Sequence, residues 1–213
     1  MCDIYVYMKA LEKIKYVIAL LGIVLTMSSC SNESDAVLTN QQKAIETYLS
    51  SSHKPRLIEE SKIYDSLDDQ PQFYTRWGMN IYRYIATFYD EGRDERKEIT
   101  RGTTFEMRYN AYIFTNGDPE RIENLYATND AKSIQKLKDE GLNAEYEWSS
   151  EPMRIKLGYG NMIGGLDTAL EGCREGDIVE VYLTYDAAYG KQYIGKLPSK
   201  SAVAWFIEIL KVE

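Results

Sequence analysis

Histidine and cysteine are scarce in this sequence: there is one histidine, His53, and there are three cysteines in 213 residues. A Ser-His or Cys-His nucleophile would have to use His53, which follows a run of serines and is expected to be a solvated loop residue. Without clustered cysteine or histidine a zinc site is not expected, and no phosphate-binding P-loop is present. Few groups remain for hydrolytic or redox chemistry, and no cofactor is expected.

Long apolar runs and basic tracts are also missing. The uncharged apolar stretch Tyr16–Met27 has twelve residues, whereas a membrane-spanning helix needs about 20. The net charge is −8, so a surface that tracks nucleic-acid phosphates is not expected. With 44% hydrophobic and 27% charged residues, the composition excludes an intrinsically disordered chain and a polytopic membrane protein. The length predicts one domain with attachments.

The first thirty residues are expected to be an export signal. Three lysines precede the apolar stretch, as in the positive region of a signal peptide. The stretch runs into Met27-Ser28-Ser29-Cys30, and small residues directly before a cysteine resemble a bacterial lipobox. The resemblance implies that residues 1–29 are a lipoprotein signal peptide and that Cys30 is lipidated. The protein would then be lipid-anchored to a membrane of the bacterial cell envelope, facing the periplasm or the cell surface. An ordinary signal peptide with an incidental cysteine is the alternative.

Residues 30–72 are expected to form a tether and an N-terminal helical segment. Asn40 is a candidate N-cap, and the apolar residues after it recur with the spacing of a helix that buries one face. A stretch of serines and a proline then predicts the end of that helix. Strand patterns dominate farther along the chain, so a folded domain is expected over residues 73–213.

Alternation of apolar and polar side chains predicts the strands. From Phe105 to Ile113 every second residue is apolar, which is typical of a strand with one buried face, and Tyr109 is therefore expected to face the core. Further strands are expected over 80–89, 153–157, 179–184 and 203–212. Because short turns or loops join most of them, the sheet is expected to be mainly antiparallel.

Two short helices complete the pattern. Asp130–Glu140 predicts a helix that ends at Gly141. Gly164–Gly172 predicts another, with Leu166, Ala169 and Leu170 at positions i, i+3 and i+4. A mainly antiparallel sheet with one short central helix indicates the α+β class.

Six short motifs follow one another in about the last sixty residues. They are Leu157-Gly158, Met162-Ile163-Gly164-Gly165-Leu166, Gly176, Tyr185-Asp186-Ala187-Ala188-Tyr189-Gly190, Leu197-Pro198 and Ile209-Leu210-Lys211-Val212-Glu213. In this order they resemble the FKBP-type peptidyl-prolyl cis-trans isomerases, and the resemblance extends upstream to about residue 79. It implies an FKBP-like fold: a mainly antiparallel sheet curved around a short helix, here with an N-terminal helical extension and one helical insertion.

The implied activity needs no reactive side chain. Rotation about an X-Pro bond takes on the order of 10–100 s because amide resonance must be broken. A dry pocket that is complementary to the twisted amide lowers this barrier. The implied partners are proline-containing peptides or unfolded exported proteins, together with a membrane through the lipid anchor; no nucleic acid is expected.

The resemblance also assigns roles by position. Tyr109, Ile163 and Tyr189 would be the catalytic contacts, with the Ile163 backbone N–H and the Tyr189 hydroxyl donating hydrogen bonds to the substrate. The substrate-binding walls would be Tyr126, Met153, Met162, Leu166, Leu197 and Trp205. Most of these side chains would equally be buried in the core of any small α+β domain, which is the alternative interpretation.

Three positions depart from the family pattern. Leu166 stands where the family has a pocket-floor tryptophan, Ala127 where it has an aspartate, and Trp205 where it usually has a phenylalanine. These departures leave a second function open. The chain would then be a catalytically weak or inactive FKBP-like lipoprotein that binds peptides, or an accessory subunit of an envelope complex.

Overall fold

The computed structural model describes residues 33–213. The expected signal peptide and Cys30 therefore lie outside the described residues. The chain divides into two compact units, Met1–Asn40 and Gln41–Glu213, and each is described by itself.

The N-terminal helical segment begins earlier than the sequence pattern predicts. Residues 33–40 are helical in the first unit, so Asn40 does not cap the helix, and that expectation is wrong. No glycine or proline lies between positions 33 and 47 to interrupt a helix. In the second unit residues 41–47 are helical and precede a π-helical turn, η1 (Tyr48–Ser52). Ile45 and Leu49 are fully buried, as the predicted apolar face requires.

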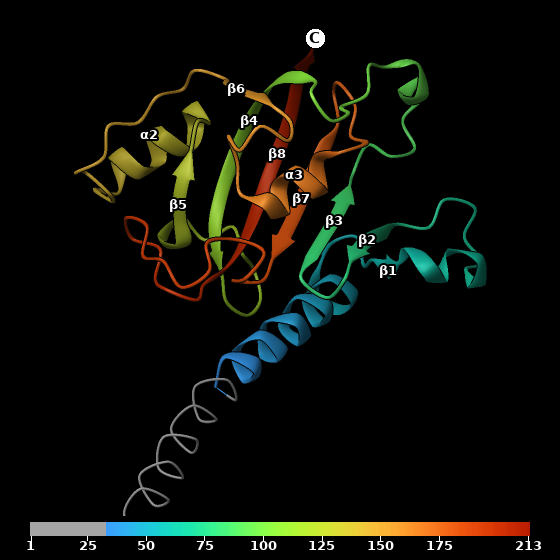
Figure 1. Ribbon diagram of the computed structural model, residues 1–213, viewed down its shortest axis with the longest axis horizontal. Coiled ribbons are helices and arrows are strands. Elements are labelled where there is room, and N and C mark those ends of the chain that lie inside the picture. Colours follow the sequence, from blue (N-terminus) through green and yellow to red (C-terminus); the bar gives the residue numbers. More distant parts are fainter. Residues whose placement is uncertain (1–32) are drawn as a thin grey trace, which may run out of the picture. The chain divides into compact units, whose positions relative to one another are not determined.

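A single sheet of eight strands forms the body of the second unit (Figure 1). The strands are β1 (Ile58–Glu59), β2 (Phe73–Trp77), β3 (Ile81–Ile85), β4 (Thr104–Phe114), β5 (Leu125–Thr128), β6 (Met153–Lys156), β7 (Ile178–Leu183) and β8 (Ala202–Val212). Their order is β1-β2-β3-β7-β8-β4-β5, and β6 also pairs with β4. Only the β1–β2 pair is parallel among the described strands. The predicted α+β class with a mainly antiparallel sheet is confirmed.

The main core lies on the face of the sheet that β4, β7 and β8 share. Phe105, Met107, Tyr109 and Ala111 of β4 are buried in this core, which confirms the predicted alternation in that strand. The strand predicted over 80–89 ends at Ile85. Its last aromatic residues, Phe88 and Tyr89, turn back instead, and their rings pack against Phe73 at centroid distances of 4.9 and 6.5 Å.

Two α-helices accompany the sheet in the second unit: α2 (Ala131–Asp139) and α3 (Gly164–Leu170). Asp130 caps α2 by accepting a hydrogen bond from Ser133 N at 2.9 Å. In Figure 1, α2 lies beside β5, whereas α3 lies over the strands of the main core. The 3₁₀ turns are η2 (Glu60–Asp65), η3 (Arg93–Glu95) and η4 (Ile122–Asn124). None of the helices within residues 33–213 is long and apolar enough to cross a bilayer.

His53 is buried, so the expectation of a solvated loop residue is wrong. It is 4% exposed, and its Nε2 lies 3.0 Å from Oε2 of Glu180 on β7. Its Nδ1 faces the carbonyl oxygen of Pro55. A backbone carbonyl and a carboxylate both accept hydrogen bonds from a ring N–H. Burial by itself lowers the pKa of His53, but the hydrogen bonds to Glu180 and Pro55 and the nearby acidic charges together raise it.

Candidate functional site

The nine pocket residues expected from the sequence gather around one apolar cluster. Four of them are buried within it: Tyr109, Leu166, Leu197 and Trp205. The other five are partly exposed and pack against it: Tyr126, Met153, Met162, Ile163 and Tyr189. The structure therefore places all nine in or against one cluster, and we call the four buried side chains the floor and the five partly exposed ones the rim. Their individual roles toward a substrate stay predictions.

The aromatic part of the floor comes from β4 and β8. Trp205 pairs with Ala111 across the ladder, and Tyr109 pairs with Ile207. Because Ala111 has no side chain beyond its methyl group, the indole is free to lie diagonally against Tyr109. The two ring centroids are 4.9 Å apart with an interplanar angle of 31°.

A β-bulge turns Tyr126 toward this floor. On β5, Ala127 pairs with Ala111 and Leu125 pairs with Tyr112, which leaves Tyr126 as the extra residue. Leu125 is buried in a separate cluster with Tyr112, whereas Tyr126 packs on the main cluster. A regular strand would have placed Leu125 and Ala127 on the same face. The bulge thus provides an aromatic wall beside Trp205, at a centroid distance of 6.2 Å.

Tyr189 reaches the site from the segment between β7 and β8. The chain turns at Gly190, which has φ +63°, a conformation that favours glycine, and Gly190 N donates to Tyr185 O at 2.7 Å. The Tyr189 ring stands edge-on to Tyr126, with centroids 6.1 Å apart. The Tyr126 hydroxyl donates to the Tyr189 hydroxyl over 3.4 Å, a long and weak contact.

The N-terminal end of α3 faces the Tyr189 segment. Ile163 is the N-cap residue with extended backbone, and its carbonyl accepts hydrogen bonds from Leu166 N and Asp167 N. Within residues 33–213 the Ile163 N–H itself has no backbone acceptor. One residue into the helix, Gly165 N donates to Ala187 O at 3.2 Å. This hydrogen bond holds the segment that contains Ile163 next to the segment that contains Tyr189.

The site is electrically neutral and rich in hydrogen-bond donors. Burial raises the pKa of Tyr109 and of Tyr189. Burial raises the pKa of Tyr126 well above its ordinary value, and the neighbouring Tyr189 adds to this. All three hydroxyls therefore keep their protons at neutral pH. Among residues 33–213 no group of three or more His, Cys, Asp or Glu side chains is arranged to hold a metal ion.

Residues 130–210 match the family model of FKBP-type peptidyl-prolyl cis-trans isomerase. The match covers less than half of the chain. It includes seven of the nine site residues and leaves out Tyr109 and Tyr126, which lie upstream on β4 and β5.

One solved structure similar to the chain contains the three FKBP domains of wheat FKBP73. The identity is 15%, and the similarity covers 67% of this chain and 51% of that chain with a TM-score of 0.48. The chain thus spans about half the length of that structure. No curated protein matches the chain.

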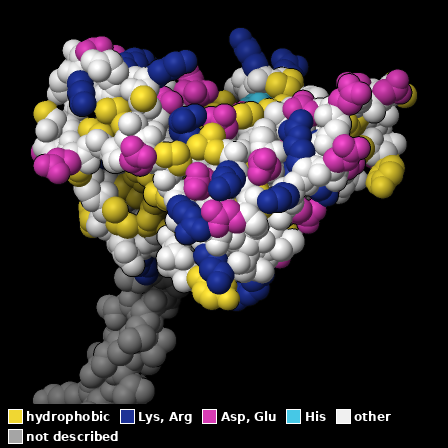
Figure 2. Space-filling model, turned by 90° about the horizontal axis from the view of Figure 1, so that it is seen from above, with side chains coloured by type: hydrophobic (Ala, Val, Ile, Leu, Met, Phe, Trp, Pro, Cys, Tyr) yellow, Lys and Arg dark blue, Asp and Glu magenta, His cyan; other side chains and the backbone are white. Residues whose placement is uncertain are grey.

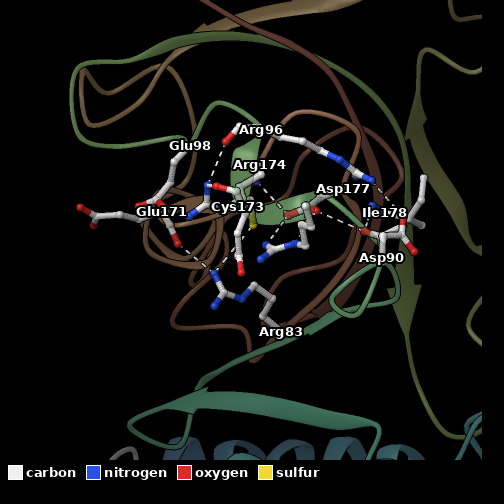
Figure 3. A network of polar contacts seen from close by, with 12 residues as sticks. Arg83, Asp90, Arg96, Glu98, Glu171, Cys173, Arg174, Asp177 and Ile178 are labelled. Atoms are coloured by element: carbon white, nitrogen blue, oxygen red, sulfur yellow. Dashed lines mark hydrogen bonds and ion pairs between the residues drawn. The ribbon is translucent and has the colours of Figure 1, made fainter. Parts of the chain in front are cut away.

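A polar network braces the other end of α3 (Figure 3). Arg83 Nη1 donates to the carbonyl oxygens of Ala169 at 2.9 Å and Glu171 at 2.8 Å. Carbonyls at a helix C-terminus lack partners within the helix, and an arginine is a favourable donor there. Cys173 lies beside this arginine and is fully buried, and burial raises its thiol pKa to about 11. It is therefore an inert core residue and not a nucleophile.

The surface of the second unit carries an apolar hollow. Figure 2 shows hydrophobic side chains gathered in a recess, with charged side chains of both signs around it. The recess lies on the side of the molecule where Figure 1 shows β5 and α2. A separate cavity of about 410 Å³ lies beside His53 and is lined by polar groups that include Asp118, Glu120 and Glu180. The sequence pattern does not foresee that cavity, because its residues come from four distant segments.

Proposed function

We propose that this protein is a peptidyl-prolyl cis-trans isomerase of the FKBP type that acts on X-Pro bonds. One observation carries the proposal: the nine residues expected from the family resemblance meet in one apolar cluster. Two donors flank this cluster from separate segments, the Ile163 N–H at the start of α3 and the Tyr189 hydroxyl.

The mechanism follows from desolvation and shape. A planar X-Pro amide is polar and well hydrated, whereas the twisted amide has lost resonance and part of its dipole. An apolar recess therefore disfavours the planar form relative to the twisted one, and donors at the rim hold the flanking peptide carbonyls during rotation. No proton moves, so neutral tyrosines with raised pKa values are suited to this task.

The departures at Leu166 and Ala127 change the lining of the proposed recess. Leu166 is 1% exposed and gives an aliphatic floor, while the stacked Tyr109 and Trp205 rings supply aromatic area. Ala127 packs against the cluster as a methyl group, so that position offers no polar partner to a substrate. These two residues favour the second candidate function, a module that binds proline peptides without accelerating rotation.

Replacing Tyr189 with phenylalanine is expected to lower kcat/KM for X-Pro peptides about 5–10-fold, the value of one lost hydrogen bond. The measurement is cis-to-trans exchange in an X-Pro peptide series with and without the protein. Tyr193→Phe is the matched control, because Tyr193 lies in the same segment but is 79% exposed, and it should leave the rate unchanged.

The assay also separates the two candidate functions. No acceleration at high micromolar protein would refute catalysis. Saturable peptide binding without any rate effect, weakened by Tyr189→Phe, would establish the binding module instead. Failure to bind any proline peptide would contradict both.

We further propose that the protein is exported and lipid-anchored in a bacterial cell envelope, where exported proteins would be its substrates. The support is the apolar stretch followed by Met27-Ser28-Ser29-Cys30. Cys30→Ser is expected to abolish incorporation of labelled fatty acid in a bacterial host and to shift the protein out of the membrane fraction. Cys2→Ser is the control and should change neither. Equal labelling and equal membrane association of the Cys30→Ser protein would contradict the proposal.

A further inference from the structure

Trp205 carries a buried donor without a partner. Its indole Nε1 is buried and makes no hydrogen bond to any residue of the described part of the chain, and the residue is 6% exposed. A buried donor that lacks an acceptor costs about 1–3 kcal/mol, and such atoms are rare in native proteins. Within residues 33–213 the only other side-chain atom of this kind is Nε of Arg83. An unsatisfied N–H inside a candidate site therefore points to an acceptor that a ligand brings.

Trp205 lies beside Tyr126, whose hydroxyl contacts that of Tyr189. Tyr126 stands edge-on to Trp205 at 81°, and the indole N–H lowers the pKa of Tyr126 without closing a hydrogen bond of standard geometry. The Tyr126 hydroxyl is itself engaged with Tyr189 over 3.4 Å. The three rings thus lie next to one another, and the hydrogen bond between the two hydroxyls is long and weak. A ligand that separates Tyr126 from Tyr189 loses little and reaches the indole.

We propose that the Trp205 Nε1–H donates a hydrogen bond to the carbonyl oxygen of the residue that precedes the substrate proline. The inference rests on the proposed function and names the substrate atom that this donor binds. An X-Pro amide has no N–H, so its carbonyl oxygen is the only strongly polar atom that enters the recess with the proline ring. Buried alone, that oxygen would lose its hydrogen bonds to water. Pairing it with Trp205 satisfies an unpartnered acceptor and an unpartnered donor in one contact.

The chemistry of the twisted amide determines which kinetic constant this contact affects. Rotation removes resonance, so the oxygen carries less negative charge in the transition state than in the planar substrate. A hydrogen bond to that oxygen is therefore stronger in the ground state and improves binding without lowering the barrier. Trp205 acts as a specificity residue for the X-Pro amide, whereas the donors at the rim hold the flanking carbonyls.

Trp205→Phe keeps an aromatic ring and removes the N–H. We expect KM and Kd for an X-Pro peptide to rise about 5–10-fold, which corresponds to one hydrogen bond, while kcat does not fall. A second peptide carries sulfur in place of the carbonyl oxygen before proline and is a weaker acceptor. The wild-type protein should bind this sulfur peptide less tightly than the oxygen peptide. The Trp205→Phe protein should bind the two peptides about equally well. Trp148→Phe is the control, since Trp148 packs against the separate cluster that contains Tyr112 and Leu125.

A direct readout does not depend on catalysis. In the proton NMR spectrum, the indole N–H resonance of Trp205 is identified by its loss in the Trp205→Phe protein. This resonance should move downfield when the X-Pro peptide binds. Two results overturn the inference and leave the proposed function intact. One is peptide binding without a change in the indole N–H chemical shift, and the other is an equal loss of affinity for the sulfur peptide in both proteins. A changed indole N–H chemical shift without acceleration of cis-to-trans exchange supports the inference and refutes catalysis. Absence of both binding and acceleration overturns both.

Discussion

Gly165→Ala is expected to lower kcat/KM for X-Pro peptides about 100-fold and to destabilise the protein by about 1–3 kcal/mol. A Cβ at this position would sit closer to Ala187 O than real atoms approach, and 2.9 Å from Leu183 Cδ2. A backbone carbonyl cannot rotate away, so either α3 or the 184–190 segment must shift. The shift separates the Ile163 N–H from Tyr189, and a displacement of about 1 Å in such a site can cost two orders of magnitude.

Gly164→Ala is the matched control. A Cβ there would meet nothing within 4 Å, and alanine favours a helix over glycine by about 1 kcal/mol. This variant should be as stable as the wild type or more so, and should keep its rate. Unfolding by urea and the exchange assay measure the two effects. A Gly165→Ala protein with wild-type kcat/KM would contradict the close contact between α3 and the Tyr189 segment.

Asp177→Asn is expected to destabilise the protein by about 3–5 kcal/mol, a large part of the stability of a typical domain. Asp177 is fully buried and accepts from Arg93 Nε at 2.8 Å and Nη2 at 2.6 Å. It also accepts from Arg174 N at 2.8 Å and Thr87 Oγ1 at 3.2 Å. An asparagine offers one acceptor oxygen for these four donors and leaves the buried Arg93 cation without its counter-charge. The turn that follows α3 (Figure 3) would lose its central acceptor.

Asp90→Asn tests whether burial causes this effect. Asp90 belongs to the same network and pairs with Arg96 at 3.4 Å, but its side chain is 47% exposed. Exposed ion pairs contribute about 0–1 kcal/mol, so this variant should unfold at nearly the wild-type urea concentration. An equal loss of unfolding free energy in the two variants would show that the buried Arg93–Asp177 contact contributes no more to stability than the exposed Asp90–Arg96 pair.

Local patterns were enough for the elements that build the site. The alternation in β4 predicted its buried face, and Tyr109 lies on it. The apolar spacing in α3 predicted the buried Leu166, Ala169 and Leu170. The helix expected before Gly141 is present as α2. These predictions succeed because the period of buried positions follows from backbone geometry within the segment itself.

Other features depend on residues far away in the chain. His53 was expected in solvent, but its partner Glu180 lies 127 positions later. Nothing in the serine-rich segment around His53 specifies that contact. The strand expected to continue to Tyr89 ends at Ile85 because Phe88 and Tyr89 find Phe73 as a packing partner. Asn40 has the chemistry of a cap, yet the residues before it are also helical.

By itself the sequence determined the α+β class, the main strands and helices, and, through the family resemblance, the nine residues that gather at the candidate site. The tertiary structure alone decided how they face one another. The bulge opposite Ala111 and Tyr112 turns Tyr126 to the main cluster, and the small Ala111 lets Trp205 lie against Tyr109. The physical reason is that periodicity belongs to a segment, whereas register, bulges and unpaired donors exist only after distant strands have been brought together.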